Sequence, residues 1–150
     1  GGNGVSAGGD RKGRDQRLGH EGCLKQCLAS ARACTAISQC PIPVIVAIHD
    51  YCLGVGIEVV GSADIAIANE EALFQWTEID NGTIGGAAQG FRMLPPQALR
   101  YLMFTAEPIT ARDLWSRGAL TEVVPASAYY RTIRLQWAKN PRRKLFKFTL

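Results

Sequence analysis

The sequence lacks an apolar run long enough to cross a bilayer, and it shows no signal-peptide pattern. These absences argue against a membrane or secreted protein and predict a soluble protein of the cytoplasm or an organelle matrix. Internal repeats and low-complexity segments are also missing. What remains is 150 residues, 47% of them hydrophobic, which suffice for one domain with a sizeable core.

No two cysteines have the Cys-X-X-Cys spacing, and their number is odd. The five are Cys23, Cys27, Cys34, Cys40 and Cys52. This pattern predicts reduced thiols rather than a disulfide framework or a zinc site. The first three fall on one side of a predicted helix, where we expect buried or half-buried thiols.

No known nucleic-acid reader motif accompanies the basic runs, so a nucleic-acid partner is not expected. The net charge of +4 comes from the two ends of the chain, and the middle is close to neutral. The basic residues are Arg11, Lys12, Arg14 and Arg17 near the start, and Arg142, Arg143, Lys144 and Lys147 near the end. They fit two solvated faces, or a cationic surface for the phosphates of a nucleotide-type ligand.

Three short apolar stretches predict buried strands at 44–48, 64–68 and 73–76. Glu58 follows the first strand, just after the turn Gly54-Val55-Gly56, where a helix is expected to begin. Glu78 follows the third strand, shortly before the turn signal Asn81-Gly82. Two carboxylates thus follow two strands beside glycine-rich turns, which is where open α/β sheets commonly build a site.

Helical spacing predicts further elements around these strands. Residues 1–19 are expected to be loop-like, and helices are predicted over 22–39, 85–93, 97–105, 110–118 and 127–139, with a strand over 120–124 and a helix start over 141–150. The helix over 22–39 has a stripe of small residues, so we expect it to pack closely on the sheet. At Thr110-Ala-Arg-Asp113 a capping box with Asp in place of Glu is predicted. The order of elements predicts an α/β fold.

Several motifs in order resemble the crotonase superfamily, also called the enoyl-CoA hydratase/isomerase family. They are Ser-Ala-Gly-Gly-Asp at 6–10, Pro-Val-Ile-Val-Ala-Ile-His-Asp-Tyr-Cys-Leu-Gly-Val-Gly-Ile-Glu at 43–58, Ala-Asp-Ile-Ala-Ile-Ala at 63–68, and Phe-Gln-Trp-Thr-Glu-Ile-Asp-Asn-Gly-Thr-Ile-Gly-Gly at 74–86, with a further match over 106–125. The resemblance implies a crotonase-like core of the ββα-superhelix type over 1–125 and the start of a C-terminal helical region over 126–150. Family chains are longer, so the sequence resembles a fragment or shortened copy that is truncated at both ends.

The resemblance also implies an oxyanion hole, in which two backbone N–H groups stabilise the enolate of an acyl-CoA thioester. By position these are the N–H groups of Gly9 and Val55. Val55 departs from the glycine that is usual in the family, so its side chain must point away from the thioester and its backbone must avoid positive φ.

In the hydratase branch of the family, two glutamates hold one water, and Glu58 and Glu78 stand at both positions. Two nearby carboxylates repel, so one pKa should be raised. Gly86 matches a backbone position near the catalytic water. Gly85 replaces the usual proline, and Ala88-Gln89-Gly90-Phe91 replaces a stretch that usually starts with two glycines.

The resemblance places substrate and CoA contacts at Ala7, Gly9, Asp10, Arg11, Leu53 and Trp76. Core packing is the alternative for Trp76. His49 is a possible base, but a structural role at a strand end is the favoured interpretation, and Asp50 is interpreted as a turn residue.

The function implied is a lyase reaction, the hydration of a 2-enoyl-CoA to a 3-hydroxyacyl-CoA. CoA enters as part of the substrate, with no separate cofactor and no metal. Alternatives are an isomerase, a hydrolase of a ketoacyl-CoA or cyclic β-diketone, and a non-catalytic binding or assembly homologue with RNA-binding basic ends. We also expect a homo-oligomer, a trimer or hexamer, because missing terminal segments would leave apolar surface uncovered.

Overall fold

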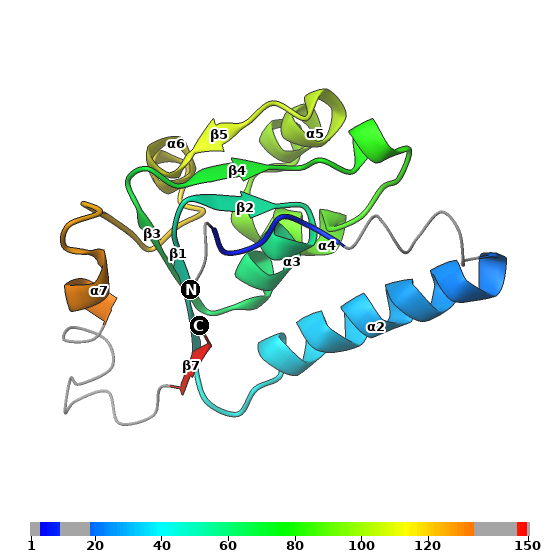
Figure 1. Ribbon diagram of the computed structural model, residues 1–150, viewed down its shortest axis with the longest axis horizontal. Helices are drawn as coiled ribbons and strands as arrows, with labels where there is room; N and C mark the ends of the chain where they lie inside the picture. Colours follow the sequence, from blue (N-terminus) through cyan, green and yellow to red (C-terminus); the bar gives the residue numbers. More distant parts are fainter. Residues whose placement is uncertain (1–3, 10–18, 134–146, 150) are drawn as a thin grey trace.

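The protein consists of two sheets and the helices that cover them (Figure 1). The computed structural model describes residues 4–9, 19–133 and 147–149. The first sheet is parallel and has the order β6-β3-β1-β7. Its strands are β1 (Val44–Ile48), β3 (Ile65–Asn69), β6 (Glu122–Val124) and β7 (Lys147–Thr149). The second sheet has the order β2-β4-β5, with β2 parallel to β4 and β5 antiparallel to it. Its strands are β2 (Tyr51–Leu53), β4 (Leu73–Gln75) and β5 (Ile109–Thr110). The predicted α/β class is therefore confirmed.

Strand β1 is buried on both faces, which explains its continuous apolar sequence. Val46 and Ile48 belong to the main core, which the helices share, whereas Ile45 and Ala47 belong to a second cluster with Tyr129 on the opposite face. The three strands predicted at 44–48, 64–68 and 73–76 are confirmed to within one residue.

The helices also follow the predicted pattern. They are α2 (His20–Ser38), α3 (Val55–Ser62), the 3-10 turn η1 (Ile79–Asn81), α4 (Ala87–Met93), α5 (Pro96–Thr105), α6 (Ala111–Ser116) and α7 (Tyr129–Thr132). The hydroxyl of Thr110 accepts a hydrogen bond from the Asp113 N–H at 3.1 Å, so the predicted cap is confirmed. Gly118, with φ of 78°, follows the end of the same helix. The helix predicted over 127–139 begins as α7, and its part from residue 134 lies outside the described residues.

Three strands were not predicted, because each depends on a partner distant in the chain. A bend at Asp50, with φ of 52°, separates β1 from β2, where the sequence predicted a turn alone. Strand β5 pairs with β4. The helix predicted over 141–150 is wrong at 147–149, because these residues form β7 and pair with β1.

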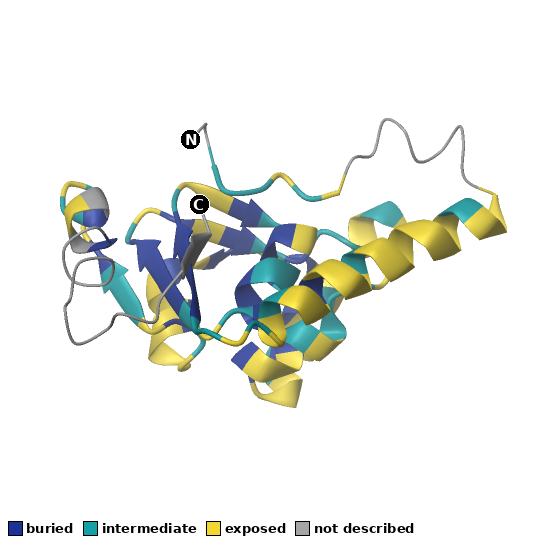
Figure 2. Cartoon of the chain, turned by 90° about the horizontal axis from the view of Figure 1, so that it is seen from below, coloured by how far each residue is buried: buried dark blue, intermediate teal, exposed yellow. Residues whose placement is uncertain are grey.

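Helix α2 contradicts the expectation that its small-residue stripe packs on the sheet. Most of its residues are exposed, Cys34 is its one buried residue, and it contacts α3 (Figures 1 and 2). Cys23 and Cys27 are exposed, so the burial predicted for them is wrong. All five cysteines lie in the described residues, and none of them forms a disulfide there.

Helix α3 approaches α4 closely at Gly61. A methyl group at this position would lie 2.5 Å from the carbonyl oxygen of Gln89 and 2.9 Å from its Cβ. We therefore expect Gly61→Ala to lower the free energy of unfolding by about 1–3 kcal/mol, because the two helices must move apart. Thermal unfolding followed by circular dichroism measures this, with Gly19→Ala as the control, since nothing lies within 4 Å of Gly19. Equal melting temperatures for both variants would contradict the expected overpacking.

Candidate active site

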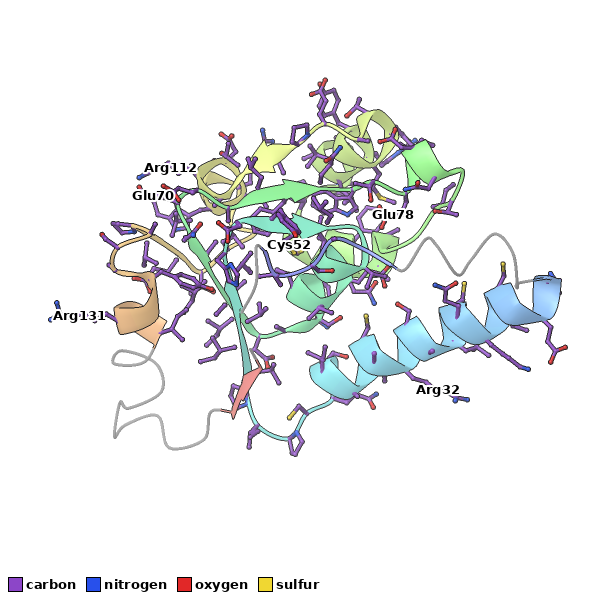
Figure 3. All side chains as sticks on the ribbon, in the orientation of Figure 1. Arg32, Cys52, Glu70, Glu78, Arg112 and Arg131 are labelled. Carbon is purple, nitrogen blue, oxygen red and sulfur yellow. The ribbon has the colours of Figure 1, made fainter. Side chains whose placement is uncertain are left out.

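Glu58 and Glu78 lie close together because the strands that precede them pair. Leu53 at the end of β2 is in register with Gln75 at the end of β4, and the Gly54 N–H donates to the Gln75 carbonyl at 3.0 Å. The parallel pairing brings the carboxyl ends of both strands to one edge. Glu58 then stands in the first turn of α3. Glu78, which Figure 3 labels, stands just before η1.

Both glutamates border the space beside Gly85. A methyl group at Gly85 would lie 3.3 Å from Glu58 Oε1 and 3.8 Å from Glu78 Cγ. At Gly86, which precedes α4 with φ of 69°, a methyl group would lie 3.0 Å from Glu58 Cγ. At Gly54 it would lie 3.2 Å from Glu78 Oε1. Three glycines thus leave room around the two carboxylates.

The carboxyl of Glu78 has a raised pKa. Burial raises its pKa above the ordinary value of 4.5, a backbone hydrogen bond at Glu78 opposes this, and the nearby Glu58 carboxylate raises the pKa further. Its Oε2 atom is buried and has no hydrogen-bond partner among the described residues. A raised pKa for one member of the pair is what the sequence predicted.

Glu58 is held by side chains of α2. The Ser30 hydroxyl donates a hydrogen bond to Glu58 Oε2 at 2.9 Å, and the Cys34 thiol approaches the same oxygen at 3.9 Å. Neither contact was predicted from the sequence. Ser30 and Cys34 are four residues apart and so share a face of the helix, but nothing in the sequence identifies Glu58 as their partner.

The loop that carries Gly9 runs alongside β2 and reaches the start of α3. The Val5 N–H donates to the Tyr51 carbonyl at 2.9 Å, and the Leu53 N–H donates to the Ser6 carbonyl at 2.9 Å. Further along the loop, Gly8 Cα lies 3.6 Å from the position of a methyl group at Gly54. Gly9 therefore follows a residue that is already in contact with the turn before Val55.

Val55 is the first residue of α3, and its side chain is 38% exposed. It is absent from the described non-glycine residues with positive φ, which are Asp50 and Ala106. Within the described part of the chain, no acceptor is found for its N–H, as is usual for the first N–H groups of a helix. The valine therefore fits this turn without backbone strain.

The other predicted contact residues are distributed around this site. Ala7 is exposed in the loop beside β2, and Leu53 is half-buried at the end of β2. Trp76 is 1% exposed within the main core, a position that fits the packing alternative. Asp10 and Arg11 lie outside the described residues. His49 contacts Asp50 at 2.8 Å through Nδ1 at the bend after β1, which fits the structural role.

A small apolar hollow adjoins Glu78 on the side of α5, and no sequence pattern predicted it. Its volume of about 10 Å³ is about that of one water-sized sphere, and it is lined by Glu78, Ile79, Thr83, Ile84, Met103 and Phe104. Its walls come from two segments distant in the chain, which explains why no local motif revealed it.

No helix in the described residues is long and apolar enough to span a membrane. The same residues hold no cluster of three or more His, Cys, Asp or Glu side chains suited to a metal ion. The groups present at the candidate site are two carboxylates, one of them with a raised pKa, and backbone N–H groups at the start of a helix.

The family model described as enoyl-CoA hydratase/isomerase matches residues 1–148. Among curated proteins, the chain is 36% identical over 124 residues to the (7aS)-7a-methyl-1,5-dioxo-2,3,5,6,7,7a-hexahydro-1H-indene-carboxyl-CoA hydrolase of Rhodococcus jostii, covering 83% of this chain and 48% of that protein. It is 33% identical over 95 residues to the mitochondrial Delta(3,5)-Delta(2,4)-dienoyl-CoA isomerase of Rattus norvegicus, covering 61% of this chain and 29% of the isomerase.

Solved structures show the same fold. The crystal structure of an enoyl-CoA hydratase of Mycobacterium smegmatis has a TM-score of 0.84 at 24% identity, with 91% of this chain and 54% of that chain covered. That of Shewanella pealeana has a TM-score of 0.76 at 25% identity, with 91% and 54% covered. The chain spans about half the length of the first curated relatives it matches, 48% and 50%.

Proposed function

Because the chain belongs to the enoyl-CoA hydratase/isomerase family, the crotonase superfamily, we propose that it acts on an acyl-CoA and hydrates a 2-enoyl-CoA to a 3-hydroxyacyl-CoA. The observation that carries this proposal is the shared position of Glu58 and Glu78 beside Gly85. Hydration needs one group to take a proton from water and one to give a proton to carbon, and two carboxylates in one space provide both.

The two glutamates differ in a way that supports separate roles. Glu58 accepts a hydrogen bond from Ser30, which suits a charged carboxylate, whereas burial raises the pKa of Glu78, which suits a proton donor. In the proposed reaction Glu58 takes a proton from water while the oxygen of that water bonds to the β-carbon. The electrons of the double bond move toward the thioester, and Glu78 gives its proton to the α-carbon.

The developing enolate needs fixed donors aimed at the thioester oxygen. We propose the N–H groups of Gly9 and Val55 for this role. The support is that the loop before Gly9 contacts the turn before Val55, and that the start of α3 adds its positive end to the same place. Leu53, Ala7, Asp10 and Arg11 stay predicted CoA contacts, and Gly86 a predicted water-positioning residue.

No separate cofactor enters this proposal, because the carboxylates and the backbone donors supply both parts of the chemistry and CoA arrives with the substrate. The predicted trimer or hexamer stays a prediction. Apolar side chains on the surface of two helices support it, namely Leu24, Leu28, Tyr101 and Phe104, which are 52%, 46%, 55% and 58% exposed. The predicted cellular compartment also stays a prediction.

Hydrolysis of a cyclic diketone carried on CoA is the second candidate. The relative from Rhodococcus jostii, at 36% identity, is named as a hydrolase of a CoA-linked bicyclic dione. Water activation between two carboxylates serves this reaction too.

An assay with a panel of acyl-CoAs tests the proposal. The purified chain is incubated with 2-enoyl-CoAs of several lengths, a 3-enoyl-CoA and a cyclic β-diketone acyl-CoA, and the products are separated by chromatography and identified by mass. Gain of one water by the 2-enoyl-CoA with retention of the CoA ester supports hydration. Ring opening of the cyclic β-diketone acyl-CoA without hydration of any 2-enoyl-CoA would support hydrolysis as the function instead. Binding without turnover would support the non-catalytic alternative.

A further inference from the structure

Helix α2 contacts the rest of the protein mainly through the second half of its length. In this half Cys34 is buried and Ser30 and Ile37 are half-buried, while the residues between them are exposed. The first half projects past the body of the protein (Figures 1 and 2). The side of the helix that faces the protein is therefore the side that carries Ser30 and Cys34.

The point of contact is the carboxylate of Glu58. Ser30 donates to Oε2 at 2.9 Å, and the Cys34 thiol lies 3.9 Å from the same oxygen. A hydroxyl is a stronger hydrogen-bond donor to a carboxyl oxygen than a thiol is, and the bond from Ser30 has the shorter distance of the two. Ser30 is therefore the main group that fixes this oxygen.

The two oxygens of Glu58 face different neighbours. Oε2 faces α2, whereas Oε1 lies 3.3 Å from the methyl position at Gly85, on the side shared with Glu78. Fixing one oxygen of a planar carboxylate also fixes the direction of the other. Without the Ser30 bond, the end of the Glu58 side chain can rotate, and Oε1 no longer keeps a defined place beside Gly85.

We propose that Ser30 is a positioning residue for the reaction: its hydroxyl holds Oε2 of Glu58 on the α2 side and so presents Oε1 to the water between Glu58 and Glu78. This inference rests on the proposed function and extends it to a helix outside the sheet. Ser30 acts through Glu58 and does not itself touch the reacting atoms.

A structural role alone would give a different pattern from a positioning role. Loss of helix docking lowers the melting temperature and the fraction of folded protein, and the apparent kcat then falls in proportion to that fraction, whereas loss of orientation leaves the melting temperature and the folded fraction nearly unchanged. Loss of orientation lowers kcat and leaves KM nearly unchanged, because the Glu58 base acts in the transition state rather than in binding. Thr adds a methyl group but keeps the hydroxyl, so Ser30→Thr should retain much of the kcat that Ser30→Ala loses.

The experiment compares Ser30→Ala, Ser30→Thr and Ser38→Ala in the full chain with the most active 2-enoyl-CoA. Ser38 is the matched control, because its hydroxyl bonds to the Thr35 carbonyl of the same helix at 3.2 Å and does not contact Glu58. We expect Ser30→Ala to lower kcat about 10-fold or more with KM changed less than about twofold, since a tenfold effect corresponds to about 1.4 kcal/mol. Ser30→Thr should recover most of the loss, and Ser38→Ala should behave as the wild type.

The result that overturns the inference is a wild-type kcat for Ser30→Ala, or an equal loss in Ser38→Ala. Crystal structures of the wild type and Ser30→Ala give a readout independent of turnover. A Glu58 carboxylate that keeps its orientation without the hydroxyl also overturns the inference. If the wild type converts no acyl-CoA of the panel, the proposed function fails and the positioning role fails with it, whereas an active wild type with an unaffected Ser30→Ala overturns the inference alone.

Discussion

Glu78→Gln is expected to lower kcat for hydration by about 10²- to 10⁴-fold, because an amide cannot give the proton that a carboxylic acid gives to the α-carbon. Gln has nearly the same shape as Glu, so it fills the same space beside Gly54 and Gly85. Substrate binding should change little, and the loss should appear in kcat rather than in KM. Steady-state kinetics with a 2-enoyl-CoA measures both.

Asp80→Asn is the matched control, because Asp80 is an exposed carboxylate two residues after Glu78. It should keep wild-type kcat. Equal activity of Glu78→Gln and the wild type would remove Glu78 from the mechanism, even if the fold and the family stand.

Glu78→Gln, which should lower activity, should not lower the stability of the fold at pH values above the native pKa of Glu78. Burial holds the native pKa of Glu78 above 4.5, so the folded protein retains the proton over a pH range in which the unfolded chain has lost it. The contribution of Glu78 to stability is therefore greatest below pH 4.5 and falls as pH rises through the native pKa. Above this range Glu78→Gln should be as stable as the wild type or more stable, and thermal unfolding at several pH values measures the difference.

Val55→Pro is expected to lower kcat by about 10²- to 10³-fold, the usual cost of losing one oxyanion donor. Proline removes the N–H of Val55 and leaves the rest of the backbone in place. It is well tolerated at the first position of a helix, because that N–H has no partner within the helix. The loss of kcat should occur with every acyl-CoA that the protein converts, because the missing N–H acts in the chemical step.

Val55→Ala is the control, since it shortens the side chain but retains the N–H. It should stay within about threefold of the wild type, because the Val55 side chain is 38% exposed and belongs to neither described core cluster. Circular dichroism must show the same helix content for both variants. A folded Val55→Pro protein with wild-type kcat would show that this N–H does not bind the thioester oxygen.

Local sequence was sufficient for the central strands and for the placement of both glutamates. The apolar runs of β1 and β3 have no polar face, which is the pattern of strands buried on both sides. Glu58 and Glu78 stand next to turns that glycine makes possible, so their place after the strands was visible in the chain. The cap at Thr110 was equally local, because its partner Asp113 is three residues away.

Predictions failed where the outcome depended on a distant partner. A local pattern could not show that 147–149 would pair with β1 rather than continue a helix. For the same reason α2 was expected to cover the sheet, although it contacts α3 and leaves Cys23 and Cys27 exposed. Small residues make a close approach possible, but they do not select the surface that is approached.

The sequence by itself identified the candidate site residues: two glutamates, each after a strand, and a small-residue loop before them. Only the tertiary structure decided that the two glutamates border one space. The pairing of β2 with β4 brings Glu58 and Glu78 to Gly85, and the docking of α2 brings Ser30 to Glu58. Burial of Glu78 in that space, which raises its pKa, follows from the same assembly. The physical reason is that propensity and periodicity act over a few residues, whereas register, helix docking and desolvation arise only when segments 20 or more residues apart, as Ser30 and Glu58 are, come into contact.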